Sequence, residues 1–395
     1  MPIKNRFADL QKEMVSWRHD FHEYPELQFD LPRTTKKITE LLNGFGVDSI
    51  KSEVGKSGIV AEIHGQKIDS GKAIGFRADM DALPVSEMNN FSHKSKIENK
   101  MHACGHDGHT TILLGAAKYL CETRNFNGKI VLVFQPAEEG GGGAKAMVDD
   151  NLILNWDISE IYGLHNLPNL PVGEFAIKPG PLMAASDFFE IVVEGKGGHA
   201  ALPHFSNDTT LASSAIVLAL QQIVSRRVSA LQSVVLSVTG LSTDTMAHNV
   251  TPDTVRITGT TRFLNENERQ KMPEQIKKTA ESTAEAYGCS AHIQYGFGVG
   301  VTDNYVKNTE FAIAAAEEVV GTSNISTDIE PIMAGEDFSE MLTKCPGAFI
   351  FLGNGQSASW HNPSYDFNNE ALPFGCSWFA NLAEQRLPLN KFNFG

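Results

Sequence analysis

The chain has no basic block and no long uninterrupted apolar run. The longest apolar candidate, residues 211–224, is broken by Ser213, Ser214, Gln221 and Gln222, which is typical of a packed helix and too polar to span a membrane. The formal net charge of −14 makes nucleic acid and anionic membranes poor partners. The first residues lack an apolar signal core, so we expect a cytoplasmic protein. We expect it to bind neither nucleic acid nor a membrane.

Cysteine is also scarce, with five residues in 395. An odd, scattered set does not match a disulfide framework, and a reducing compartment fits it better. We expect four of these residues to be small buried apolar side chains, namely Cys121, Cys289, Cys345 and Cys376. Cys104 is then the functional candidate.

The chain does contain a pair of adjacent carboxylates, Glu138 and Glu139, directly after the apolar residues 129–134. The apolar run predicts a buried strand with the pair at its carboxyl end. In extended backbone, neighbouring side chains point to opposite faces, so one carboxylate could bind a metal while the other faces a bound water. Metal-assisted hydrolysis needs a cation that acidifies water and a base that takes its proton. A solvated acidic loop is the alternative.

A second feature is the cluster at residues 101–109, which packs three histidines and Cys104 into nine residues. Thiolate and imidazole are the preferred ligands of zinc and its neighbours. The apolar residues 110–120 predict a helix, so the cluster lies at a helix N-terminus. Cys104 and His106 are two residues apart and could reach one ion from a turn. The alternatives are a redox cysteine, a polar loop, or a cysteine nucleophile with His106 as its base.

Further ligand-type residues follow predicted strands. Asp79 and Asp81 end the strand that begins at residue 73, and His165 ends the strand that begins at residue 161. His361 lies a short loop beyond residues 348–352. In open α/β sheets, functional sites gather outside the carboxyl ends of the strands. The sequence therefore predicts one site assembled from four strands.

The chain is long enough for two or three domains. Strands and helices alternate before residue 186 and again after about residue 298. The middle predicts a strand at 187–194, a helix at 207–227, strands at 233–240 and 254–263, a helix at 266–287 and a strand at 289–297. This is the ferredoxin-like split order, inserted in a larger α/β domain. Because His361 follows the insertion, the outer segments must fold together.

Ordered motifs along nearly the whole chain resemble those of the metal-dependent amidohydrolases that include hippurate hydrolase, N-acyl-amino-acid hydrolases, N-acetyldiaminopimelate deacetylase and indole-acetyl-amino-acid hydrolases. The motifs occupy residues 17–27, 77–84, 104–106, 135–139, 163–165, 197–204, 335–338 and 361–367. The resemblance implies a zinc-exopeptidase-like α/β catalytic domain with a mixed sheet, residues 1–185 plus 298–395. It also implies an inserted ferredoxin-like α+β lid or dimerisation domain, residues 186–297.

The same resemblance implies roles for single residues. The metal ligands would be Cys104, His106, Glu139, His165 and His361. Glu138 would be the general base, and Asp81 would orient a ligand. Asp79 falls where some relatives have a ligand histidine, so its role stays open.

In the inserted domain, His199 would reach the active site of a partner subunit and steady the oxyanion there. Asn249 and Arg262 would hold the substrate carboxylate, for which the planar fork of arginine is well suited. The resemblance thus implies a homodimer or larger homo-oligomer formed through this domain.

Together these features predict an enzyme that hydrolyses an N-acyl amino acid to a carboxylic acid and a free amino acid. We expect one or two divalent ions per subunit, with zinc, manganese, cobalt and nickel all open. A dipeptidase or carboxypeptidase with the same chemistry is one alternative. A metal or amino-acid binding protein with an idle site is another, although such a protein needs no base at Glu138.

Overall fold

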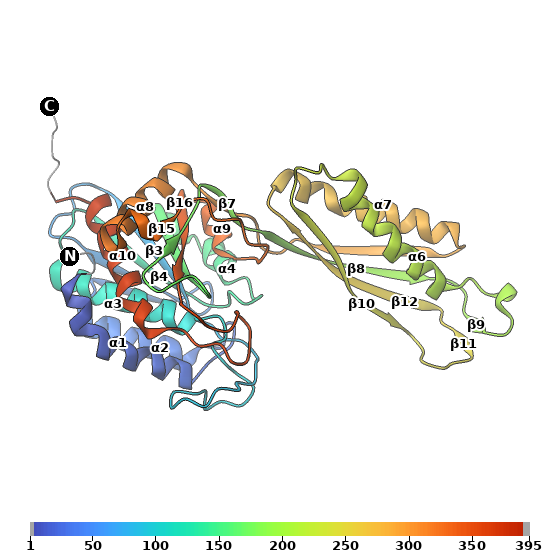
Figure 1. Cartoon of the computed structure of the whole chain (residues 1–395), viewed down its shortest axis with the longest axis horizontal. Helices are drawn as coiled ribbons and strands as arrows, with labels where there is room; N and C mark the ends of the chain where they lie inside the picture. The colour runs from blue at the N-terminus through green and yellow to red at the C-terminus, as the bar shows by residue number, and fades with distance from the viewer. Residues whose placement is uncertain (1–3, 390–395) are drawn as a thin grey trace. The chain divides into compact units, whose positions relative to one another are not determined.

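The computed structural model describes residues 4–389 and divides the chain into two compact units (Figure 1). The first takes in Met1–Leu182, Asp303–Glu330 and Asp337–Gly395, and the second takes in Met183–Thr302 and Pro331–Glu336. The second unit contains the whole segment 186–297 and also includes residues 331–336, which were predicted from the sequence to lie in the catalytic domain. The assignment of catalytic and lid roles to the two units stays a prediction.

The first unit is built on an eight-stranded mixed sheet with the order β1-β2-β4-β3-β5-β16-β6-β15. Its strands are β1 (Ser49–Val54), β2 (Gly58–His64), β3 (Ala73–Asp79), β4 (Lys129–Gln135), β5 (Ile158–Leu167), β6 (Phe175–Ala176), β15 (Ile325–Ser326) and β16 (Gly347–Gly353). The four central strands, β4, β3, β5 and β16, run parallel, so their carboxyl ends meet at one edge. The predicted mixed α/β sheet is confirmed.

Helices cover both faces of this sheet. One layer holds α1 (Asn5–Glu23), α2 (Pro32–Phe45), α3 (His106–Thr123), α8 (Val306–Val320) and α10 (Leu372–Arg386), and the other holds α4 (Gly143–Asp149), α5 (Leu152–Asn155) and α9 (Phe338–Leu342). Side chains alternate along β5: Tyr162 and Leu164 join the core under the first layer, while Gly163 leaves room for Phe338 of α9. Among residues 4–389, no helix combines the length and apolar character needed to cross a membrane.

The second unit has the predicted ferredoxin-like arrangement. Its elements are β8 (Ala185–Glu194), α6 (Thr209–Gln222) with a π-helical turn (Ile223–Arg227), β10 (Val234–Thr243), β12 (Thr254–Phe263), α7 (Glu266–Ala286) and β13 (Ser290–Gly296). They form an antiparallel sheet of order β10-β12-β8-β13, and α6 and α7 lie along one face of it (Figure 1). A small ribbon of β9 (Gly198–His199) and β11 (Val250–Thr251) extends this unit.

The short elements that remain connect these parts. They are the strands β7 (Gly180–Met183) and β14 (Thr302–Asn304) and the 3-10 turns at Pro203–Phe205, Thr322–Asn324 and Asn369–Ala371.

A buried ion pair closes one end of the ferredoxin-like unit. Asp187 on β8 is fully buried and accepts hydrogen bonds from Arg269 Nη2 at 2.7 Å, from the Tyr295 hydroxyl at 2.9 Å and from the Gly298 backbone N–H at 3.0 Å. The carboxylate thus ties β8 to α7 and to the end of β13. Removing it would leave the guanidinium of Arg269 buried and uncompensated, which is costly.

We predict that Asp187→Ala lowers the free energy of unfolding of this unit by about 3–5 kcal/mol. The matched control is Glu190→Ala on the same strand, whose pairing with Arg256 is solvent-exposed and worth about 0–1 kcal/mol. Urea unfolding followed by circular dichroism measures both. Equal effects of the two substitutions would contradict a structural role for the buried pair.

Candidate metal centre

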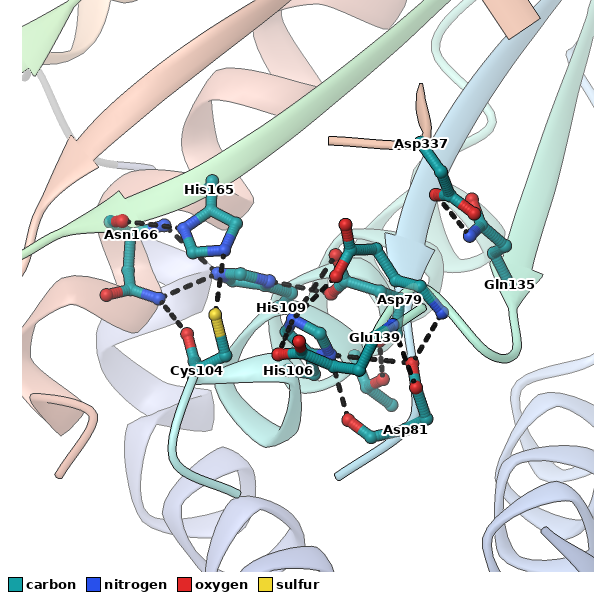
Figure 2. Close-up of polar contacts among 12 residues, drawn as sticks. Asp79, Asp81, Cys104, His106, His109, Gln135, Glu139, His165, Asn166 and Asp337 are labelled. Carbon is teal, nitrogen blue, oxygen red and sulfur yellow. Dashed lines mark hydrogen bonds and ion pairs between the residues drawn. The ribbon is translucent and has the colours of Figure 1, made fainter. Parts of the chain in front are cut away.

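The predicted ligands converge where the parallel strands end (Figure 2). β3 ends at Asp79, β4 leads into Glu138 and Glu139, and β5 carries His165 near its carboxyl end. Cys104 and His106 stand at the start of α3, which begins at His106. The parallel strands and the helix start therefore bring together side chains from distant parts of the chain, as the sequence predicted.

Cys104 belongs to two ligand groups at once. Its Sγ lies 3.4 Å from His165 Nε2, and Cys104, His106 and His165 offer ligand atoms within 4.8 Å of one another. The same spacing holds for Cys104, Glu139 and His361. Burial and the charge of Glu139 raise the pKa of the Cys104 thiol well above its usual range, so its thiolate needs a cation nearby. The two groups of candidate ligands share the sulfur of Cys104, and each group could bind one cation.

Backbone carbonyls orient two of the imidazoles. His106 Nδ1–H donates to the Asp81 carbonyl at 2.8 Å, and His165 Nδ1–H donates to the Asn166 carbonyl at 2.7 Å. Both rings therefore turn the lone pair of Nε2 toward the site, which is the arrangement that metal-ligating histidines use. Because a carbonyl oxygen can only accept a hydrogen bond, the proton of each neutral imidazole must lie on Nδ1.

Two buried polar atoms of the site have no hydrogen-bond partner among residues 4–389. They are His106 Nε2 and Glu139 Oε1, although the latter lies 3.3 Å from His361 Nε2. Buried polar atoms are normally satisfied, and a bound cation would satisfy both of these atoms. A donor set of sulfur, nitrogen and oxygen fits zinc and its neighbours. The residues present therefore fit the divalent cations that the sequence predicted.

Asp79 and His109 lie beside the cluster, with Asp79 Oδ2 3.8 Å from His106 Nε2, and hydrogen bonds within the chain hold both side chains. His109 Nδ1–H donates to Asp79 Oδ1 at 2.7 Å, and His109 Nε2 accepts the Asn166 backbone N–H at 3.0 Å. Both imidazole nitrogens are thus in use. Asp79 Oδ2 accepts from Arg77 at 2.8 Å, and although burial disfavours its charge, His106 and Arg77 hold the pKa of Asp79 well below its usual range. The geometry favours a positioning role for Asp79, which the sequence left open.

The two glutamates do not lie in extended backbone. Ala137 has a left-handed φ of +51°, and Glu138 and Glu139 lie in a turn. The expectation that the pair points to opposite faces of a strand is therefore wrong. Glu138 Oε2 and Glu139 Oε1 each lie 4.0 Å from His106 Nε2, so both carboxylates point toward the cluster.

Asp81 fixes this turn. Its carboxylate accepts the backbone N–H of Glu138 at 2.9 Å and that of Glu139 at 3.2 Å, while its carbonyl holds His106. Asp81 is fully buried, and burial raises its pKa. One residue thus orients both glutamates and one imidazole, which is compatible with the ligand-orienting role that the resemblance implied.

Asn166 is a positioning residue that the sequence did not single out. Its Nδ2 donates to the Cys104 carbonyl at 2.6 Å, and its Oδ1 accepts the Tyr365 hydroxyl at 2.8 Å. Gly105 has φ +93°, and a Cβ there would lie 2.4 Å from Asn166 Nδ2. Only glycine therefore fits between Cys104 and His106. The one signal for Asn166 in the sequence is its place directly after His165.

Two residues of the motif at residues 17–27, Arg18 and His22, take part in a buried polar network. Arg18, fully buried on α1, donates to Asp107 Oδ2 at 2.9 Å and also pairs with Asp366. His22 Nδ1 lies 2.8 Å from the same Asp107 oxygen. Although burial disfavours its charge, Arg18 and His22 hold the pKa of Asp107 well below its usual range. This network joins α1, the start of α3 and the segment that carries His361.

His361 comes from that segment with a left-handed φ of +64° and a half-exposed side chain. Its backbone N–H donates to the Ala103 carbonyl at 2.8 Å, which fixes it beside Cys104. The prediction that a residue after the insertion joins the cluster agrees with this geometry.

The candidate residues of the second unit do not all lie together. Val250 pairs with His199, and the Ala200 N–H donates to the Asn249 carbonyl at 3.0 Å, so His199 and Asn249 are neighbours. Arg262 lies at the other end of β12, where it pairs with Ser186. At about 3.3 Å per residue, the strand from Thr254 to Arg262 alone spans about 26 Å. One small substrate cannot contact both ends of this unit within one chain.

Arg262 itself is half-buried on the sheet face opposite to the helices. Its guanidinium bonds to the Thr260 hydroxyl and the Thr261 carbonyl, and burial lowers its pKa. Across the part of the chain that the structure describes, no carboxylate lies within ion-pair distance of it. A partly desolvated cation in this state suits an anionic ligand.

The fold and the cluster define a metal-dependent hydrolase. The family model described as peptidase family M20/M25/M40 matches residues 75–385, and the chain belongs to this family as a metal-dependent amidohydrolase. Hippurate hydrolase of Campylobacter jejuni is 42% identical, covering 97% of this chain and 99% of its own. N-acetylcysteine deacetylase of Bacillus subtilis is 38% identical, covering 94% of this chain and 96% of its own.

A solved structure shows the same architecture. The Bacillus subtilis YXEP protein, described as a dinuclear metal binding peptidase of the M20 family, is 34% identical and superposes with a TM-score of 0.83. The match covers 96% of this chain and 99% of that one.

Residues that hydrogen-bond to metal ligands usually contribute to metal affinity, and Asn166 holds the backbone of Cys104. We therefore predict that Asn166→Leu weakens metal binding about 10- to 100-fold. Competition with a chromophoric chelator measures the apparent Kd for zinc. Asn155→Leu, at the exposed end of α5, is the matched control and should leave the Kd unchanged. An unaltered Kd in folded Asn166→Leu would contradict the positioning role.

Proposed function

We propose that this protein hydrolyses the amide bond of N-acyl amino acids and releases a carboxylic acid and a free amino acid. The observation that carries the proposal is the place of Glu138, a partly buried carboxylate beside two ligand groups that share Cys104. The names of the relatives support the same substrate class, since hippurate and N-acetylcysteine are both N-acyl amino acids.

We infer that two divalent ions bind per subunit. Cys104, His106 and His165 would hold one of them, and Cys104, Glu139 and His361 the other. Bound there, the cations supply Lewis acidity that polarises the amide carbonyl and lowers the pKa of water. The shared thiolate favours softer ions such as zinc, while manganese, cobalt and nickel remain candidates that metal replacement can separate.

Glu138 carries the proton in this mechanism. Its carboxylate points into the cluster from a turn that Asp81 holds by two backbone hydrogen bonds. It takes a proton from the attacking water and then delivers that proton to the leaving nitrogen, so it acts first as base and then as acid. A binding or storage protein would gain nothing from a carboxylate in this place.

His199, Asn249 and Arg262 complete the proposed site across two subunits. His199 donates a hydrogen bond to the developing oxyanion, a contact typically worth about 3 kcal/mol. Since the His199–Asn249 pair and Arg262 lie at opposite ends of one unit, we infer that one substrate meets the pair from one subunit and Arg262 from the other. Arg262 then binds the substrate carboxylate through its planar fork.

The second unit offers a surface for such an assembly. β10 is an edge strand, and α6 beside it exposes Leu211 and Leu218, with 54% and 75% of their surface accessible. Unpaired strand edges and exposed leucines are typical of surfaces that meet a second copy. This supports the proposed homo-oligomer.

The proposal predicts metal-dependent release of free amino acid from N-acetyl, N-benzoyl or indole-acetyl amino acids. Metal-stripped protein is inactive, and adding zinc, manganese, cobalt or nickel singly restores turnover to different extents. Turnover of unblocked dipeptides at matching rates would instead make the protein a peptidase. Activity that persists in excess chelator would support Cys104 as a nucleophile.

Glu138→Gln is the matched variant for this assay. The amide keeps the size of the side chain but cannot take the proton, so we expect a loss of at least about 100-fold in kcat with metal content unchanged. Near-normal turnover of the metal-loaded variant would remove Glu138 from the mechanism.

A shared site predicts which inactive variants rescue each other. In a purified heterodimer, His199→Ala with Glu138→Gln regains about half of the wild-type activity, since one of its two symmetric sites is intact. His199→Ala with Arg262→Ala should also recover activity. His199→Ala with Asn249→Ala should not, because these neighbours act from the same subunit.

Two tags on differently marked chains allow the heterodimers to be isolated. Failure of the Glu138→Gln combination in a verified heterodimer would mean that each site is built from one chain. Rescue between His199→Ala and Asn249→Ala would contradict the grouping of these two residues.

A further inference from the structure

An aromatic side chain lies directly against the proposed metal ligands. Trp360, the residue before His361, packs its indole edge-to-face on the imidazole of His165, with ring centroids 4.9 Å apart at 77°. Its Nε1–H donates to Asn166 Oδ1 at 3.2 Å. Trp360 thus touches one ligand through its ring and adjoins another along the chain.

The indole is held in place from several sides. Asn166 Oδ1, its acceptor, also accepts the Tyr365 hydroxyl, and Asn166 Nδ2 is bound to the Cys104 carbonyl. The backbone that follows is fixed by the bond from His361 N–H to Ala103. Phe351 of β16 lies beside the indole, with centroids 6.4 Å apart. These contacts use the polar N–H and part of the ring, and Trp360 is only half-buried, so apolar surface of the indole stays accessible.

We propose that Trp360 forms a wall of the subsite for the acyl group and makes planar, apolar acyl groups better substrates than acetyl. The inference rests on the proposed function. The scissile carbonyl must lie at the metal ligands, so the group attached to that carbonyl is one bond away from them. The indole is in contact with His165 and precedes His361 in the chain, so it is within reach of the acyl substituent.

The indole is a better partner for the acyl half of the substrate than for its amino-acid half. The face of an aromatic ring carries negative charge density and is a poor partner for the amino-acid carboxylate, which finds its cation in Arg262. A planar ring of the substrate, by contrast, stacks or packs edge-on against indole and gains more than its buried area alone would give. The amino-acid half therefore points away from Trp360 and the acyl half toward it.

The test compares two substrates that differ only in the acyl group, N-benzoylglycine and N-acetylglycine. Trp360→Ala is expected to lower kcat/KM for the benzoyl substrate by about 10- to 100-fold and for the acetyl substrate by less than about 3-fold. Trp360→Phe keeps an aromatic wall without the N–H and should retain most of the preference. Trp156→Ala, at the end of α5, removes a half-buried tryptophan elsewhere and should change neither value.

A second readout is independent of the chemical step. Benzoate and acetate are the acid products of these two reactions, and calorimetry with the zinc-loaded protein gives the Kd of each. Trp360→Ala should weaken benzoate binding by about 10-fold and leave acetate binding unchanged. The zinc content of the same samples shows whether the substitution has impaired metal binding.

The outcomes separate the inference from the proposed function. Equal losses on both substrates, or a loss of zinc, would make Trp360 a purely structural support and overturn the inference while leaving the hydrolase intact. An unchanged benzoyl-to-acetyl ratio in a fully loaded variant would overturn it as well. If the metal-loaded wild-type protein hydrolyses none of the N-acetyl, N-benzoyl and indole-acetyl amino acids although benzoate still binds in a Trp360-dependent manner, the proposed function fails and the aromatic binding site at Trp360 stands.

Discussion

The centre of the first unit is organised around lone pairs that the protein itself does not satisfy. Nearly every polar atom at the carboxyl edge of the sheet has a partner within the chain, and those partners fix each side chain from behind. Carbonyls hold His106 and His165 by Nδ1, and Asp81 holds the turn of Glu138 and Glu139. Two atoms of the candidate ligands, His106 Nε2 and Glu139 Oε1, have no hydrogen-bond partner among the described residues. The cost of burying such atoms is offset when a cation binds.

This constraint explains why so many polar residues are buried around the site. Asn166, Asp79, Asp107 and Arg18 are buried, and each is hydrogen-bonded to a candidate ligand or to a residue beside one. A ligand that moves by a fraction of an ångström loses much of its value to a metal and to catalysis. The half-buried Trp360 contacts two residues of this region, His165 through its ring and Asn166 through its N–H.

The sequence predicted those site residues that lie directly after strands recognisable as apolar runs. Apolar runs located β3, β4, β5 and β16, and the parallel order then placed Asp79, Glu139 and His165 together. The turn at Ala137 was missed, because a left-handed alanine leaves no mark in a pattern of apolar residues. Asn166 and Arg18 were missed as supports for another reason: their partners lie far away in sequence, and only the packed fold shows them.

The opposite placement of His199 and Arg262 was equally hidden, since it depends on strand register. The resemblance to known hydrolases implied that His199 reaches a partner subunit and that Arg262 holds the substrate carboxylate, but it gave no distance between the two residues. The register of β8 and β12 places Arg262 about 26 Å along β12 from Thr254, a distance that a small molecule cannot bridge, and the proposal of a shared site depends on this separation.

The sheet order has a consequence for how the protein is made. β16 lies between β5 and β6, yet it follows β5 in the chain by about 180 residues. At about 5–20 residues per second, a ribosome needs roughly 10 to 40 s to synthesise that interval. Throughout this time the nascent chain presents β5, a central strand, with one edge unpaired, and such edges invite aggregation. The inserted unit can complete its own sheet in the interval, whereas the sheet of the first unit and its cluster of candidate ligands are complete only after β16 and His361 have been synthesised.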